Sequence, residues 1–348
     1  VVLTYIHSVY FYRLINRGKK FMAKVKSVIG LEVDSREIRA VEITRSSGTY
    51  SILACGKAPL PEGTIEEGFI RDPDRFNVAL TELLQSGGFK SPDVVVGINN
   101  ENVIMRYATF PKVDDDKLRN MVLLQAQEFI PIPIQEMEID YVVAGDGVND
   151  EDQPITHVML VAARRNMIEQ YINILSASKL QVTDVDSSVL SQIRGLKAGL
   201  VGDEKFALLN MTDDLLNFIV VKGDEISMVR SITTPDRVVD SVNNIYKLEP
   251  NEETLTTDVE EVGAMLASET ASSVSYYAMQ NGDSPIEKIF FTTTADQSAH
   301  LCDIIKDTIM EMPVIVPDFY STYNFGLDRN VLNEFAGCIG LGIQALEV

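Results

Sequence analysis

The 348-residue sequence contains only three cysteines, three histidines and no tryptophan. The cysteines are far apart, odd in number and form no Cys-x-x-Cys motif, which excludes a disulfide framework and indicates a reducing compartment. The histidines are equally scattered, so no zinc site is expected. We therefore predict no metal centre and no disulfide. The three cysteines are Cys55, Cys302 and Cys338.

Long apolar runs and net positive charge are lacking as well. No apolar run approaches the roughly 18–20 residues that a membrane-spanning helix requires. The chain has 30 Lys and Arg against 51 Asp and Glu, a net charge of −21. Such acidity repels phosphates and excludes direct nucleic-acid binding. There is also no phosphate-binding P-loop, no His-Glu-x-x-His motif and no nucleophile elbow, and we predict no catalytic residue.

Residues 1–26 differ from the rest, because they hold six basic residues and no acid. Val1–Tyr12 is apolar and aromatic, and the basic residues follow it. A secretory signal has the opposite order. Two interpretations remain: a short anchor on a membrane surface, or non-native or disordered sequence upstream of a natural start at Met22. We favour the second, and treat residues 1–26 as an N-terminal extension.

One order of elements occurs twice along the chain. Three strands (28–33, 37–44 and 50–57) are followed by a helix (72–86) and a buried strand (93–98). The later part repeats the order with three strands, helical segments and further buried strands. The pattern predicts an α/β, duplicated, two-lobed fold. The later strands are Phe206–Met211, Leu215–Val221, Glu225–Ile232, Lys288–Phe291 and Pro313–Val316.

An inserted α/β subdomain is predicted at residues 102–179. Pro131 and Pro133 force an extended path after its first helix. Near the C-terminus, Gly337, Gly340 and Gly342 indicate that the last helix packs very close to another backbone. The predicted division is a first-lobe core (27–101 and 180–203), the insertion (102–179), a second-lobe core (204–234 and 285–348) and its helical part (235–284).

Two predicted hairpins stand where such a fold holds a nucleotide. That role requires an acid for magnesium and glycines beside the phosphates. Glu32 can serve as the acid of the first hairpin, but Asp34 stands where that hairpin requires a glycine. In the second hairpin the neutral Asn210 stands where an acid is required. We expect weak or absent binding of ATP and magnesium at these positions. The candidate nucleotide-contact residues are Glu32, Asp34, Ser35, Arg36, Asn210, Thr212, Asp213, Thr292 and Thr293.

From Ser27 to Val348 the chain resembles the PilM-type type IV pilus assembly proteins, which are actin-like relatives of the division protein FtsA. The most specific stretch is Gln-Glu-Phe-Ile-Pro-Ile-Pro at 127–133, followed by 137–143, 158–165 and 180–186. The resemblance implies an actin-like fold with subdomains 1A, 1C, 2A and 2B, of which 1C is the insertion. It also implies ATP binding between the lobes, although the family's glycines are replaced at 34, 212 and 292–293.

The resemblance further implies a groove beside the insertion that receives the cytoplasmic N-terminus of the inner-membrane protein PilN. We expect a cytoplasmic scaffold of a pilus machine, held at the inner face of the membrane by partners that include motor or platform proteins. A charge at Ile132 is expected to abolish partner capture without unfolding. The candidate partner residues are Met105, Tyr107, Phe129, Ile130, Pro131, Ile132 and Pro133.

Three alternatives remain open. The chain is an ATP-binding or ATP-hydrolysing actin-like switch, or a cytoplasmic scaffold of type II secretion, or a sugar-kinase-like enzyme. The last ranks lowest because no catalytic aspartate is evident. Proteins with the same fold perform many different functions, so the fold alone does not distinguish these three alternatives.

Overall fold

The computed structural model describes residues 26–199, 204–213, 215–223, 225–247, 249–281, 285–310, 312–320 and 323–347. The interpretation of residues 1–21 therefore lies outside the described part. The chain forms two compact units, Val1–Gly199 with Asp318–Val348 and Leu200–Pro317. We call them unit 1 and unit 2. Across the described ranges, no helix is long and apolar enough to cross a membrane.

Unit 1 is built on a five-stranded sheet with the order β10-β6-β1-β2-β3. The first three strands form an antiparallel meander, while β6 and β10 run parallel to β1. β1 is buried along nearly its whole length, which explains its continuous apolar sequence. Helix α2 (Pro73–Ser86) begins where the Asp72 carboxylate accepts the Arg75 amide. The strands are β1 (Ser27–Val33), β2 (Glu37–Ser46), β3 (Thr49–Pro59), β6 (Asp93–Ile98) and β10 (Gln181–Ser187).

The C-terminal helix α10 (Ala336–Glu347), preceded by α9 (Arg329–Glu334), packs against β1, β2 and helix α5 (Ser188–Gly199) of unit 1. A Cβ atom on Gly30 would lie 2.0 Å from the carbonyl oxygen of Cys338. The predicted close approach of this helix to another backbone is thus confirmed. The predicted assignment of Asp318–Val348 to the second lobe is wrong, because this segment belongs to unit 1. Gly337 and Gly342 of α10 fit the helix closely against Glu32 of β1 and Ile43 of β2.

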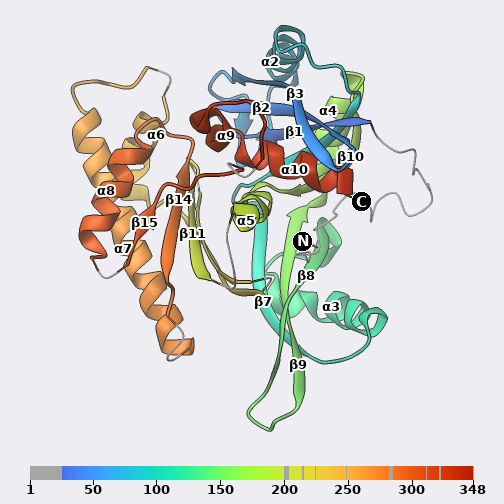
Figure 1. Ribbon diagram of the computed structural model, residues 1–348, viewed down its shortest axis with the longest axis vertical. Coiled ribbons are helices and arrows are strands. Elements are labelled where there is room, and N and C mark those ends of the chain that lie inside the picture. Colours follow the sequence, from blue (N-terminus) through green and yellow to red (C-terminus); the bar gives the residue numbers. More distant parts are fainter. Residues whose placement is uncertain are drawn as a thin grey trace. The chain divides into compact units, whose positions relative to one another are not determined.

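The insertion forms its own three-stranded antiparallel sheet with the order β7-β9-β8 (Figure 1). Helix α3 (Asp115–Phe129) covers one face, and Leu118, Val122 and Ala126 of this helix join the core there. The stretch after α3 bends at Pro131 and Ile132 and ends in a short 3-10 helix, η1 (Ile134–Glu136), so the extended path predicted from the two prolines is not formed. The strands are β7 (Val103–Pro111), β8 (Met137–Val148) and β9 (Pro154–Arg164).

Helix α4 (Arg165–Ala177), predicted as part of the insertion, also packs against the main sheet of unit 1. It contacts β10 and β5 (Phe69–Ile70), which pairs with β4 (Ile65–Glu66). The Tyr171 hydroxyl donates to the carbonyl of Gly68, and the Gln170 amide donates to that of Ile70. These contacts join α4 to β10 of the main sheet and to the β4–β5 hairpin.

Unit 2 repeats the sheet pattern of unit 1, with the order β13-β12-β11-β14-β15. Its first three strands form an antiparallel meander and the last two run parallel to β11, which confirms the predicted duplication. The predicted helical part at 235–284 begins with a 3-10 turn followed by a short helix. The elements are β11 (Lys205–Met211), β12 (Leu215–Lys222), β13 (Glu225–Thr233), η2 (Asp236–Val238), α6 (Val239–Ile245), α7 (Leu255–Asn281), β14 (Lys288–Thr293), α8 (Ser298–Thr308) and β15 (Val314–Ile315).

Candidate functional site

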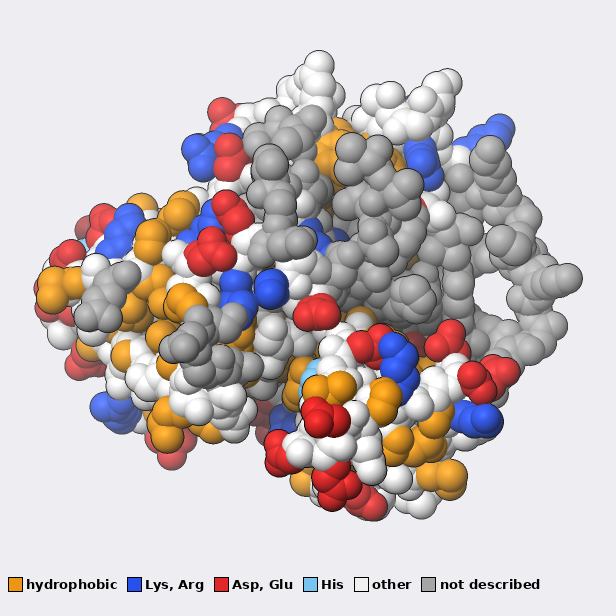
Figure 2. Space-filling model, turned by 60° about the horizontal axis from the view of Figure 1, so that its bottom comes forward, with side chains coloured by type: hydrophobic (Ala, Val, Ile, Leu, Met, Phe, Trp, Pro, Cys, Tyr) orange, Lys and Arg blue, Asp and Glu red, His pale blue; other side chains and the backbone are white. Residues whose placement is uncertain are grey.

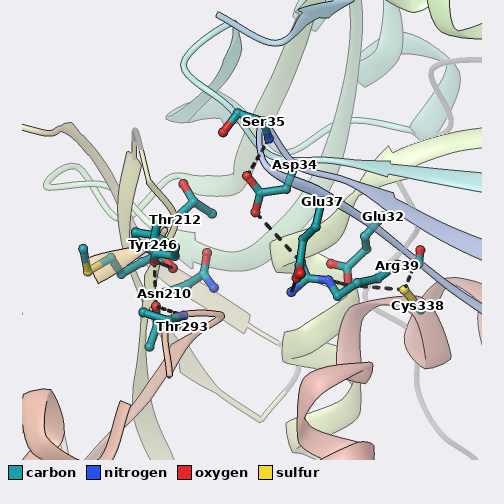
Figure 3. Close-up of polar contacts among 12 residues, drawn as sticks. Glu32, Asp34, Ser35, Glu37, Arg39, Asn210, Thr212, Tyr246, Thr293 and Cys338 are labelled. Carbon is teal, nitrogen blue, oxygen red and sulfur yellow. Dashed lines mark hydrogen bonds and ion pairs between the residues drawn. The ribbon is translucent and has the colours of Figure 1, made fainter. Parts of the chain in front are cut away.

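Glu32 and Arg39 are cross-strand neighbours in the β1–β2 hairpin of unit 1. Both are buried, with 4% and 5% of their surfaces exposed. The Arg39 guanidinium lies 3.8 Å from the Glu32 carboxylate, 3.3 Å from that of Glu37 and 4.0 Å from that of Asp34 (Figure 3). Burial by itself lowers the pKa of Arg39, but the three carboxylates raise it above its ordinary value. The hairpin therefore carries its own permanent cation.

The Glu32 carboxylate also contacts helix α10. The Cys338 thiol lies 3.4 Å from it, and a Cβ atom on Gly337 would lie 2.1 Å from one of its oxygens. Burial and the Glu32 charge raise the pKa of Cys338 well above that of an ordinary thiol. An anion at the start of a helix is stabilised by the helix dipole. Glu32 thus holds α10 on the sheet.

The turn of this hairpin brings Asp34, Ser35 and Arg36 together, as the sequence predicts. The Ser35 amide donates to the Asp34 carboxylate at 2.7 Å, and the Asp34 amide donates to the carbonyl of Glu37 at 3.0 Å. The carbonyl of Arg36 accepts the amide of Leu60. An amide that a glycine turn would offer to a phosphate is here bonded to a carboxylate of the turn itself.

In unit 2, the remaining candidates meet at the ends of β11 and β14. The Asn210 amide donates to the Thr292 hydroxyl at 3.0 Å. The Tyr246 hydroxyl donates to the carbonyl of Met211 at 2.9 Å and lies 2.6 Å from the Thr293 hydroxyl (Figure 3). The Thr212 hydroxyl bonds the main chain of Leu215, and the Asp213 carbonyl accepts the Thr234 hydroxyl.

Sequence reasoning missed Arg39 and Tyr246. Arg39 was open to prediction, because the short turn places it opposite Glu32 in an antiparallel register. Tyr246 follows helix α6 outside any motif, and only the tertiary fold places its hydroxyl beside Thr293. Arg39 pairs with Glu32 and Tyr246 bonds Thr293, and both partners are candidate nucleotide-contact residues.

The residues of each hairpin do not fit a magnesium polyphosphate. Glu32 is paired with Arg39, and Asn210 is neutral and donates its amide to Thr292. Asp34 adds a negative charge at the turn where a phosphate would approach, and repels it.

The seven candidate partner residues divide between the two faces of the inserted sheet. Phe129, Ile130 and Ile132 pack into the core that β7 and α3 share. Met105 and Tyr107 lie on the opposite face of β7, since the neighbouring Ala108 and Phe110 fill that core. The structure does not bring the seven residues to one surface.

Each face has its own chemistry. Tyr107 stacks on His157 of β9 with ring centroids 5.3 Å apart. On the α3 side, Pro131 and Pro133 are exposed, and Leu124 of α3 is 81% exposed. Apolar, acidic and basic side chains are interspersed over the lower part of the view in Figure 2.

The two meander-and-parallel sheets and the insertion define an actin-like fold. The chain belongs to the family described as type IV pilus assembly protein PilM, whose model matches residues 30–334. It is similar to a solved PilM-PilN type IV pilus biogenesis complex, with 20% identity, a TM-score of 0.74, and 93% of this chain and 100% of that chain covered. This likeness shows the fold.

Two further solved structures are more distant. The ethanolamine utilization protein EutJ from Carboxydothermus hydrogenoformans is 11% identical, with a TM-score of 0.50 and 95% and 94% of the two chains covered. The cytoplasmic domain of EpsL, an inner-membrane component of the type II secretion system of Vibrio cholerae, is 13% identical. Its TM-score is 0.38, with 65% of this chain and 79% of that chain covered, and this weak likeness carries no functional argument.

Proposed function

We propose that the protein is a cytoplasmic scaffold of a type IV pilus assembly machine. Its inserted subdomain binds the short cytoplasmic N-terminus of a PilN-like inner-membrane protein, which holds the scaffold at the membrane. The family membership and the fold of the PilM-PilN complex support this proposal. Contacts with motor or platform proteins follow from the same role.

The proposal rests on the exposure of two prolines in the segment Ile130–Ile134, which we call the prolyl segment. Ile130, Ile132 and Ile134 pack against the core of the insertion, while Pro131 and Pro133 are exposed. The segment therefore presents a preformed apolar surface. Such a surface lowers the entropy cost of peptide binding, because only the peptide and not the protein has to be ordered.

Charge favours a basic peptide as the partner. Helix α3 carries the exposed acids Asp115, Asp116 and Glu128 against Lys117 and Arg119, and the whole chain has a net charge of −21. A peptide with apolar residues flanked by Lys or Arg complements such a surface. Its affinity is expected to fall as salt rises.

The direct test is fluorescence anisotropy with a labelled peptide copied from the N-terminus of the PilN-like protein of the same organism. The P131A/P133A variant tests the prolyl segment, and Y107A tests the opposite face of β7. Loss of binding in P131A/P133A with retention in Y107A supports the proposal. The reverse result moves the site to the Tyr107 face, and no binding to the wild type overturns the proposal.

An ATP-dependent switch is the second candidate, favoured by the fold. We propose that ATP binding is weak or absent, because Arg39 pairs with Glu32 in one hairpin and Asn210 pairs with Thr292 in the other. Calorimetric titration with Mg-ATP tests this directly. No heat at millimolar nucleotide supports a nucleotide-free scaffold, whereas micromolar binding makes the switch the better description.

A further inference from the structure

The prolyl segment has few main-chain hydrogen bonds of its own. Pro131 and Pro133 have no amide hydrogen to donate. The Ile130 amide donates to the carbonyl of Ala126, which ends helix α3, and the Pro133 carbonyl accepts the amide of Glu136. The carbonyls of Ile130 and Ile132 and the amide of Ile134 need other partners.

The side chain of Gln127 contacts all three groups. Its Nε2 lies 3.3 Å from the carbonyl oxygen of Ile130 and 3.4 Å from that of Ile132. Its Oε1 accepts the Ile134 amide at 3.2 Å. One side chain thus spans the segment from its first residue to its last.

This arrangement requires a side chain that donates and accepts at once. A primary amide has two N–H donors and one acceptor oxygen, whereas a carboxylate only accepts and a thioether does neither well. Asparagine has the same groups on a side chain shorter by one methylene. Gln127 lies in the last turn of α3, where its full reach spans the prolyl segment.

We infer that Gln127 is the positioning residue of the partner site, and that it holds the bent prolyl segment in place with Pro131 and Pro133 outward, ready for an apolar peptide. This inference rests on the proposed function. The isoleucines fix the segment from the core side, and Gln127 fixes its main chain. A prolyl segment without this brace samples other conformations, and peptide binding then has to order it.

Two measurements on Q127M test the inference, because methionine matches the length of glutamine but lacks its hydrogen bonds. Amide hydrogen exchange at Ile134 is expected to accelerate about tenfold, with exchange at Leu160 in the core of β9 unchanged. The dissociation constant of the PilN-like peptide is expected to rise about five- to tenfold. Q135M is the matched control, since Gln135 is exposed in η1 and is expected to change neither value.

Q127E separates the two halves of the brace, because its carboxylate still accepts the Ile134 amide but offers no donor to Ile130 and Ile132 and repels their carbonyl oxygens. Ile134 is expected to stay less protected than in the wild type, and wild-type protection in Q127E would show that the Nε2 donor is not needed. If Ile134 exchanges at the wild-type rate in Q127M, the inference that Gln127 fixes the segment is wrong. If Ile134 exchanges faster but the dissociation constant of the peptide stays at the wild-type value, Gln127 does not position the partner site. If the wild type binds no peptide, the proposed function fails, while the exchange data still decide whether Gln127 fixes the segment.

Discussion

Glu32 and Arg39 face each other across β1 and β2, with 3.8 Å between the Arg39 guanidinium nitrogen and the Glu32 carboxylate oxygen. Neither side chain is more than 7% exposed. In a nucleotide-binding hairpin, an acid at this place would serve a metal ion. Here the Arg39 guanidinium pairs with the Glu32 carboxylate instead.

Removing Arg39 leaves the buried Glu32 carboxylate without its counter-ion. R39M is expected to lower the free energy of unfolding by about 3–5 kcal/mol, because an unpaired buried charge is costly. The double variant E32Q/R39M removes both charges and should be clearly more stable than R39M. Urea denaturation measures both. An R39M protein as stable as the wild type would show that the pair is not structural.

Gly30 is where α10 approaches the sheet most closely. In G30A the new methyl group meets the main-chain carbonyl of Cys338 at 2.0 Å, which neither backbone can yield easily. We expect a loss of about 3 kcal/mol in unfolding free energy. G56A is the matched control in the same sheet, because its methyl group meets only the end of Leu83 at 3.2 Å. Equal losses in the two variants would contradict the close packing of α10.

A charge at Ile132 is expected to unfold the insertion as well as weaken partner capture. The sequence alone favours loss of capture without unfolding, but Ile132 packs against the core of β7 and α3. I132D should therefore cost about 2–4 kcal/mol. P131A changes an exposed residue and should leave the thermal midpoint within a few degrees of the wild type. Differential scanning calorimetry compares them, and a wild-type melting curve for I132D would restore the first expectation.

Cysteine alkylation at pH 8 should follow burial. Burial raises the pKa of Cys55, Cys302 and Cys338, most of all at Cys338, so the reactive thiolate is scarce in each folded thiol. Cys338 and Cys302 are buried and should react only on unfolding, whereas the half-buried Cys55 reacts slowly. The rate should rise with pH as thiolate forms. Mass spectrometry after iodoacetamide treatment reads each site, and rapid labelling of folded Cys338 would contradict its burial.

Tyr246 ties helix α6 to the end of β11. Y246F removes the hydroxyl that bonds Met211 and Thr293, and should lower stability by about 1–2 kcal/mol. Y276F removes an exposed tyrosine hydroxyl and serves as the control, with a change expected below about 0.5 kcal/mol. Chemical denaturation separates the two. If Y246F matches Y276F, the Tyr246 contacts do not stabilise unit 2.

Strands and helices were predictable because their signals are local. Apolar periodicity and turn residues located β1, β2 and α2, and the proline pair located the end of α3. The repeated order of elements predicted the duplication, which the two sheet orders confirm. Asn210 and Thr292 were both named as candidate nucleotide-contact residues, but their hydrogen bond to each other was not predicted.

The sequence by itself determined the elements, the duplication and the family, since these depend on short-range patterns and on motif order. The tertiary structure alone decided that α10 packs on unit 1, that Arg39 pairs with the buried Glu32, and that the candidate partner residues divide between two faces. Each of these outcomes depends on which surfaces pack together. The glycines of α10 allow close packing on any neighbouring backbone, so they do not identify that neighbour. Along β7, successive side chains point to opposite faces of the sheet, so a shift of one residue changes the face.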